Sequence, residues 1–138
     1  MQTSSIKQVL GGLVFVMVAS VAAPLVAEAQ TPGVEREVLL RQDVPVPGYE
    51  AVLIAVTLAA GSREGLHTHP GTVLVYVQEG ELTLDHESRE TVTYTAGESL
   101  FVEAGTVHEG MNRGTTPVRG IATLVVEKGK PLTHQLDQ

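Results

Sequence analysis

The chain carries the sequence GSREGLHTH over residues 61–69 and the sequence GTVHEGMN over residues 105–112. Alternate residues of a β-strand point to the same face, so His67 and His69 would project together, roughly 6.6 Å apart along the strand. Two imidazoles at this spacing can converge on one ion at roughly 2.0–2.1 Å per nitrogen. His108 on a neighbouring strand would complete a three-histidine arrangement with open coordination positions, which is typical of a reactive metal site.

The strand that follows the histidine pair is predicted from the same alternation. If the histidines point inward, we expect Val73, Val75 and Val77 to do the same and to form apolar walls beside them. Leu74 and Tyr76 then lie on the outer face, where two large apolar side chains need cover. A terminal strand of the same chain or a second subunit would provide that cover, and the second option predicts a homodimer.

The residues around His108 divide between the two faces of their strand. Thr106, Gly110 and Asn112 would point inward with His108, whereas Glu109 would face away and is not expected to bind a metal. Thr106 would either support a ligand or be an ordinary β-favouring residue beside a turn. Asn112 would either orient a ligand or substrate, or cap a turn at the end of the strand.

The rest of the chain predicts an all-β, single-domain barrel. From Glu35 onward, short β-rich runs alternate with turn residues at spacings near ten, which is typical of a sandwich or barrel. The expected strands are Glu37–Arg41, Tyr49–Leu58, Gly65–His69, Val73–Gln78, Glu81–Asp85, Thr91–Tyr94, Ser99–Val102, Val107–Asn112 and Val118–Val126. The domain is expected over 37–128, with a linker over 30–36 and a C-terminal tail over 129–138.

The N-terminal residues 1–29 read as a helical secretory signal peptide. Lys7 is the only basic residue there, an apolar run spans Val9–Val26, and Ala27-Glu28-Ala29 offers a small-x-small cleavage site. The alternative is a membrane anchor, but Pro24 interrupts the run and the cleavage site follows it, so we favour removal. Cleavage would leave 109 of the 138 residues, enough for one small domain.

Composition limits the partners and the compartment. The chain has no cysteine, which excludes disulfides and a lipid-modified cysteine, and its formal net charge is −7. Without a basic stripe, nucleic-acid binding and attraction to anionic membranes are disfavoured. We therefore expect a periplasmic or secreted protein that has no stable membrane association after signal cleavage and takes a small-molecule ligand.

The spacing of the glycines and histidines resembles the two motifs of the cupin superfamily. The first motif has a glycine, five residues, His-x-His and a downstream glycine, and the second has two glycines, a histidine and an asparagine. The motif positions held in this sequence are Gly61, His67, His69, Gly80, Gly97, Gly105, His108 and Asn112. The resemblance implies a small single-domain cupin: a double-stranded β-helix, or jelly-roll barrel, in which the three histidines hold a divalent metal.

The sequence departs from the family pattern at two positions. The glutamate of the first motif falls at Val73 and the proline of the second falls at Glu103. The first change removes one metal ligand, whereas the second alters a turn. Three neutral imidazoles around a divalent ion leave a charge of +2, which makes the site a stronger Lewis acid. Fe²⁺ is the metal we favour, with Mn²⁺, Ni²⁺ or Zn²⁺ as alternatives, since imidazole suits several of these ions.

Other polar residues receive simpler interpretations. His86 and His134 fall in a predicted loop and in the tail, so both are expected to be solvated. Arg63 and Arg119 would be solvated or would place a positive charge at the barrel mouth. Glu79 lies far along its strand and is expected to sit in solvent rather than replace the missing carboxylate. Glycines at the strand breaks are expected at tight turns with positive φ.

Two functions fit these residues. The first is an enzyme with a metal on His67, His69 and His108, whose substrate pocket includes Val73, Val75, Val77, Thr106 and Asn112. The resemblance implies a dioxygenase-like oxidoreductase, because some cupin-type thiol and diketone dioxygenases use an iron site of three histidines. The second is a module that binds a metal or a small ligand without catalysis, since no general acid or base is apparent in the barrel. Because imidazole must be neutral to bind a metal, metal affinity is expected to fall as the pH drops through about 6.5.

Overall fold

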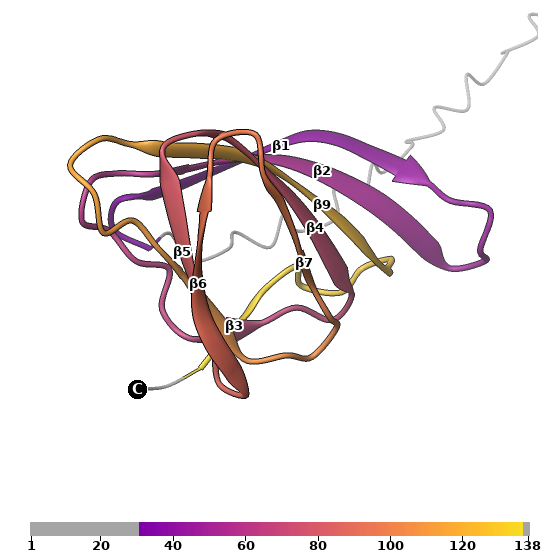
Figure 1. The fold of residues 1–138 in the computed structure, drawn as a ribbon. Helices are drawn as coiled ribbons and strands as arrows, with labels where there is room; N and C mark the ends of the chain where they lie inside the picture. Colours follow the sequence, from indigo (N-terminus) through magenta and orange to yellow (C-terminus); the bar gives the residue numbers. More distant parts are fainter. Residues whose placement is uncertain (1–30, 137–138) are drawn as a thin grey trace, which may run out of the picture.

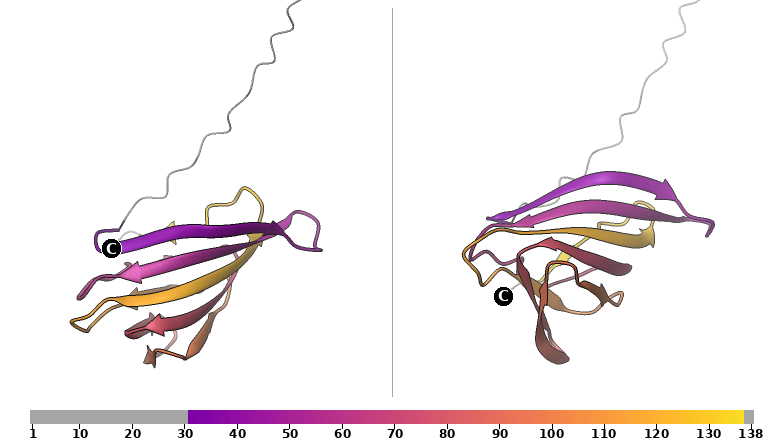
Figure 2. Two further views of the ribbon diagram at one scale, coloured as in Figure 1. Left: turned by 90° about the horizontal axis from the view of Figure 1, so that it is seen from above. Right: turned by 45° about the horizontal axis from the view of Figure 1, so that its top comes forward.

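The computed structural model describes residues 31–136, which form two antiparallel five-stranded sheets that face each other (Figure 1). The first sheet has the order β1(Val34–Asp43), β2(Tyr49–Leu58), β9(Val118–Glu127), β4(Thr72–Glu79) and β7(Ser99–Val102). The second has the order β10(His134–Gln135), β3(His67–Thr68), β8(His108–Met111), β5(Glu81–His86) and β6(Arg89–Thr95). Figure 2 shows the long strands of the first sheet side by side in one layer, which lies over the second sheet.

This architecture confirms the all-β prediction. The described residues contain no helix, and the chain passes between the two sheets in the manner of a double-stranded β-helix. The predicted signal peptide lies outside the described residues. Within residues 31–136 there is no helix with the length and apolar character needed to cross a membrane.

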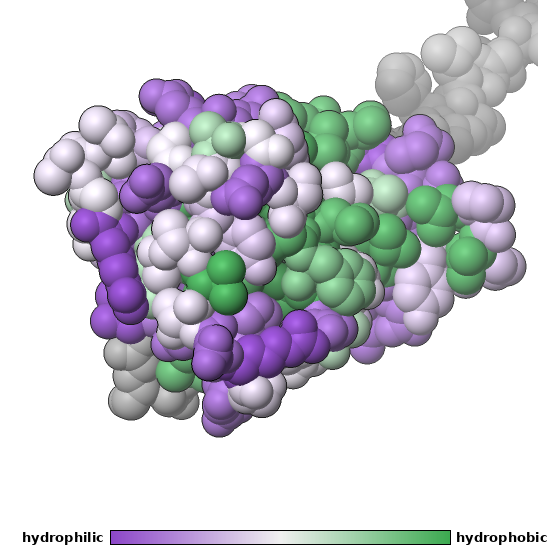
Figure 3. All heavy atoms as spheres, in the orientation of Figure 1, coloured by the Kyte–Doolittle hydropathy of each residue, from purple (hydrophilic) through white to green (hydrophobic). Residues whose placement is uncertain are grey.

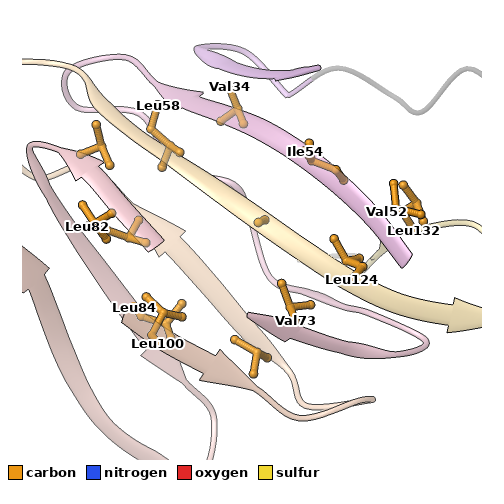
Figure 4. Close-up of a cluster of buried hydrophobic side chains, with 14 of the residues drawn as sticks. Val34, Val52, Ile54, Leu58, Val73, Leu82, Leu84, Leu100, Leu124 and Leu132 are labelled. Carbon is orange, nitrogen blue, oxygen red and sulfur yellow. The ribbon is translucent and has the colours of Figure 1, made fainter. Parts of the chain in front are cut away.

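Alternation of side chains builds the core between the sheets. Along β9, buried and more exposed residues alternate from Val118 to Glu127, so that Ala122, Leu124 and Val126 face the interior. Ile54 lies next to this row on β2 of the same sheet, and Leu84 joins the core from β5 of the other sheet. Figure 4 shows such side chains of both sheets turned toward the shared interior. Burial of aliphatic side chains at about 25 cal/mol per Å² is the main force that holds the two sheets together.

The strand boundaries differ from the prediction near the ends of the chain and near the histidines. β1 begins at Val34, inside the expected linker, because these residues pair with the end of β2. β10 lies in the segment expected to be a tail and pairs with β3. β3 is shorter than expected because Gly65 has a φ of +78°, which interrupts an extended strand. Positive φ at Gly80 and Gly105 agrees with their predicted turns.

The outer face of the first sheet is apolar. Leu74 and Tyr76 on β4 are about half exposed, as the alternation predicts, and Phe101 on β7 lies beside Leu74 with similar exposure. Figure 3 shows hydrophobic residues gathered over the region where β2, β9 and β4 lie in Figure 1. β10 belongs to the other sheet, so this terminal strand does not cover the face.

Candidate metal centre

Three histidines meet at one end of the second sheet. His67 on β3 is paired directly with His108 on β8, and His69 follows β3 by one residue. The ring centroids lie 4.9 Å apart for His67 and His69, 4.3 Å for His67 and His108, and 5.0 Å for His69 and His108. One ring nitrogen from each residue lies within 4.8 Å of the others. The structure thus brings together the three residues expected to bind a metal.

Backbone carbonyls fix the protonation of each ring. Nδ1 lies 2.7 Å from the Gly65 oxygen in His67, 2.7 Å from the Leu132 oxygen in His69 and 2.9 Å from the Thr106 oxygen in His108. A carbonyl oxygen can only accept a hydrogen bond, so Nδ1 carries the proton and donates. Nε2 of each neutral ring keeps its lone pair. Histidines that bind metals through Nε2 are oriented in this way, so the donor set fits a divalent ion.

Burial keeps the three rings neutral. It lowers the pKa of His67 and of His69 to about 4, and it lowers the pKa of His108 as well. Neutral imidazole is the form that binds a metal. Protons therefore begin to compete with a metal for these rings at a lower pH than the value near 6.5 that the sequence alone predicts.

Without metal, the protein is expected to lose stability in acid. His67 and His69 stay neutral in the fold down to about pH 4, whereas in the unfolded chain they take up protons near 6.5. Between these values the unfolded state binds more protons, so the free energy of unfolding falls as the pH falls. The loss is on the order of 3 kcal/mol for His67 alone.

Urea unfolding of metal-free protein at pH 7.5 and pH 4.5, in the presence of a chelator, measures this loss. A His67→Asn variant is the matched comparison and should lose less stability between the two pH values. Equal free energies of unfolding for the wild type at both pH values would contradict the assignment.

A small cavity opens beside the rings, with a volume of about 80 Å³. His69 and His108 line it, and aliphatic side chains form most of its walls. Val73, Val75 and Val77 are among them, in agreement with their predicted inward direction. The walls lie between the two sheets, so a ligand there would be shielded from water.

Asn112 has a structural role instead of a place in the pocket. It is only 2% exposed and is not among the residues that line the cavity. Its amide group donates to the carbonyl oxygens of Leu58, Ala59 and Thr116 at 2.8 to 3.1 Å, and its Oδ1 accepts from the Gly114 backbone at 2.9 Å. These contacts agree with the turn-capping interpretation, and they engage both the NH₂ group and Oδ1 of the side chain.

Thr106 lies beside the site but does not line the cavity either. Its backbone carbonyl, and not its side chain, makes the contact that matters, because it accepts the Nδ1 proton of His108. Thr106 thus supports His108 through its backbone.

Glu109 and Arg63 form a pair behind the metal site. The Glu109 side chain is buried, accepts two hydrogen bonds from the Arg63 guanidinium, and accepts a third from the Gly65 backbone at 2.8 Å. These bonds lower the pKa of the Glu109 carboxyl. Glu109 is not part of the histidine group, as expected. Arg63 holds this carboxylate while its own side chain stays 62% exposed, in line with the solvated interpretation, and it does not line the cavity.

Arg119 does line the cavity, and it forms an exposed ion pair with Glu79 in which Nε lies 3.2 Å from Oε2. His134 is exposed, as predicted. His86 is not solvated: it is only 7% exposed. β5 extends one residue further than expected, so that His86 pairs with His108 of β8 and its ring centroid lies 6.1 Å from that of His108.

Two cavity residues, Glu64 and Arg36, have no signal in the sequence motifs. Glu64 lies in the turn before β3 and Arg36 lies on β1, yet both line the cavity that contains His69 and His108. Oε1 of Glu64 accepts a hydrogen bond from Nη2 of Arg36 at 2.7 Å. The site therefore carries an ion pair at its edge in addition to the three imidazoles.

Comparison with known families agrees with this geometry. The model of the cupin domain matches residues 54–127, more than half of the chain, and this match includes all three histidines. The chain belongs to the cupin family. None of the curated proteins matches the chain.

Solved structures show the same fold at low sequence identity. A Klebsiella pneumoniae protein with a double-stranded β-helix domain is 20% identical to this cupin, with a TM-score of 0.62 over 80% of this chain and 90% of that one. A cupin superfamily protein of Desulfitobacterium hafniense is 16% identical, with a TM-score of 0.58 over 73% of this chain and 84% of that one.

The DMSP lyase DddQ of Ruegeria pomeroyi is also similar in fold. It is 16% identical, with a TM-score of 0.56 over 62% of this chain. This cupin spans only 42% of the length of that lyase. At these identities the comparisons show a shared fold, whereas the function depends on the residues of the site itself.

Proposed function

We propose that this cupin binds a divalent metal ion through Nε2 of His67, His69 and His108. The observation that carries the proposal is the set of three Nδ1–carbonyl hydrogen bonds, which leaves one unprotonated nitrogen on each ring. Burial supports it by keeping the rings neutral. Three protein ligands leave coordination positions open for a small molecule, as in catalytic sites.

A site of three histidines without a carboxylate resembles the iron sites of some cupin-type thiol and diketone dioxygenases, and this resemblance supports oxidative chemistry on a small oxygenated or thiol compound. Val73 stands where the family pattern has a glutamate, and Val73 is buried in the cavity wall. A divalent ion on three neutral imidazoles would supply Lewis acidity toward anionic or enolate-type ligands. Fe²⁺ is the metal we favour, and the reaction we propose is dioxygenase-like.

The experiment loads metal-free protein with Fe²⁺ under anaerobic conditions and measures the bound metal. Oxygen is then admitted with small 1,3-diketones or thiols as trial substrates, and its consumption is followed with an electrode. Consumption that needs both Fe²⁺ and substrate supports the oxidoreductase. Saturable binding of a trial compound without oxygen uptake supports the non-catalytic binding module instead. If Fe²⁺, Mn²⁺, Ni²⁺ and Zn²⁺ all fail to bind, the metal site and the oxidoreductase are wrong, and only a module that binds a small ligand without metal is left.

Export to the periplasm or out of the cell, and assembly into a homodimer, stay predictions from the sequence. The apolar outer face around Leu74 and Tyr76 is compatible with a second copy of the chain.

A further inference from the structure

The carboxylate of Glu64 occupies space that a glycine leaves on the inner face of β8. Gly110 is two residues from His108, so both positions face the same side of the strand. A Cβ atom added at Gly110 would collide with Oε2 of Glu64 and would lie 3.2 Å from its Cδ. The backbone nitrogen of Glu64 also donates to the Gly110 oxygen at 2.9 Å. Gly110 therefore admits the carboxylate to the face that carries the histidine.

Among residues 31–136, one oxygen of this carboxylate is held by a side chain. Oε1 accepts from Arg36, and both side chains are largely shielded, at 15% exposed for Glu64 and 21% for Arg36. Oε2 takes part in none of the hydrogen bonds between side chains of residues 31–136. Because Glu64 lines the cavity, its carboxylate is a charged hydrogen-bond acceptor at the site.

Glu64 is close to the histidines without belonging to their group. It lines the same cavity as His69 and His108, but it is not among the residues whose ligand atoms cluster. Most other walls of the cavity are aliphatic, and its further polar lining residues besides the histidines and Arg36 are Arg119 and Thr133. A polar group on a bound molecule thus has few partners there, and leaving Oε2 unpaired beside a ligand would cost affinity.

We propose that Oε2 of Glu64 accepts a hydrogen bond from a hydroxyl group of the small molecule that binds at the histidine site, and so selects hydroxylated ligands. The inference rests on the proposed function, since it takes the metal to hold another oxygen of the same ligand. It assigns to Glu64 the role of a positioning and specificity residue outside the metal's ligand set. A ligand that combines a carbonyl oxygen, a neighbouring hydroxyl and a short apolar body fits these three environments.

The test compares two probes that differ only by the hydroxyl, acetoin and 2-butanone. The protein is loaded with Zn²⁺, which has no redox chemistry, and each dissociation constant is measured by NMR chemical-shift titration. We expect the wild type to prefer acetoin by at least about tenfold, as a hydrogen bond to a charged group implies. In Glu64→Leu the preference should fall to less than about threefold, while Zn²⁺ binds within about threefold of the wild type.

Glu127→Leu is the matched control, because it removes a carboxylate from an exposed ion pair with Lys130, neither residue lines the cavity, and Glu64 stays in place. It should keep the preference. If Glu64→Leu fails to fold, Glu64→Gln serves instead: its amide oxygen can accept from Arg36, which places the NH₂ group at the position of Oε2 and should weaken the preference.

The possible outcomes separate the two proposals. An equal affinity of the wild type for both probes, or a preference that persists in the Glu64 variants, overturns the role of Glu64. A loss of Zn²⁺ binding confined to the Glu64 variants also overturns it, because Glu64 would then act on the metal. A wild type that binds no Zn²⁺ contradicts the metal site itself, and with it the premise on which the inference rests.

Discussion

His108→Ala is expected to weaken the binding of Ni²⁺ or Zn²⁺ by more than about 100-fold. Loss of a residue that only orients a metal ligand costs about 10- to 100-fold in affinity, so loss of one of three ligands should cost more. His108 is also the one of the three histidines that comes from β8, where it pairs with His67 of β3. Competition with a chromophoric chelator at pH 7.5 measures the dissociation constants.

The control for this measurement is His134→Ala. His134 is an exposed histidine on β10, so its removal tests nonspecific binding to surface imidazole and should change the affinity by less than about twofold. Far-UV circular dichroism of both variants checks that the fold is retained. If His108→Ala binds either metal within about threefold of the wild type, the three histidines do not act as one site.

Asn112→Ala should cost the protein about 3 kcal/mol of folding free energy. The substitution removes the donor that serves three carbonyl oxygens, and the carbonyl of Leu58 lies in a buried part of this network. A buried polar group without a partner costs about 1–3 kcal/mol, and more than one is left here. Urea denaturation of the metal-free protein at pH 7.5 gives the change in the free energy of unfolding.

The same variant distinguishes a structural asparagine from a ligand-binding one. Affinity for Zn²⁺ should stay within about twofold in Asn112→Ala, because the residue does not line the cavity. Thr115→Ala, an exposed substitution in the same turn, should change stability by less than about 0.5 kcal/mol. If Asn112→Ala is as stable as the wild type but has lost metal or ligand binding, Asn112 belongs to the binding site.

The sequence predicted the features that depend on local periodicity. The His67-x-His69 spacing and the alternation over Val73, Val75 and Val77 each follow from the two-residue repeat of a strand, and all five residues surround one site in the structure. The all-β fold followed from the spacing of turn residues. In each case the relevant information lies within one strand or within one motif.

The residues that the sequence did not reveal depend on contacts between distant strands. Arg36 and Glu64 are 28 residues apart, and nothing in either segment indicates that β1 and the turn before β3 border the same cavity. The prediction that His86 lies in a solvated loop was wrong. β5 continues to His86, past an irregularity in its pairing with β6 between Leu84 and His86. A single sequence does not reveal such registers.

The short strand β10 joins the end of the described chain to the metal centre. Its residues pair with β3, the Leu132 carbonyl just before it fixes the ring of His69, and the Gln135 side chain donates to the Glu64 carbonyl at 2.7 Å. Proteolytic loss of β10 would therefore disturb the metal centre as directly as a substitution within it. Preparations meant for metal analysis should have their mass verified at that end of the polypeptide.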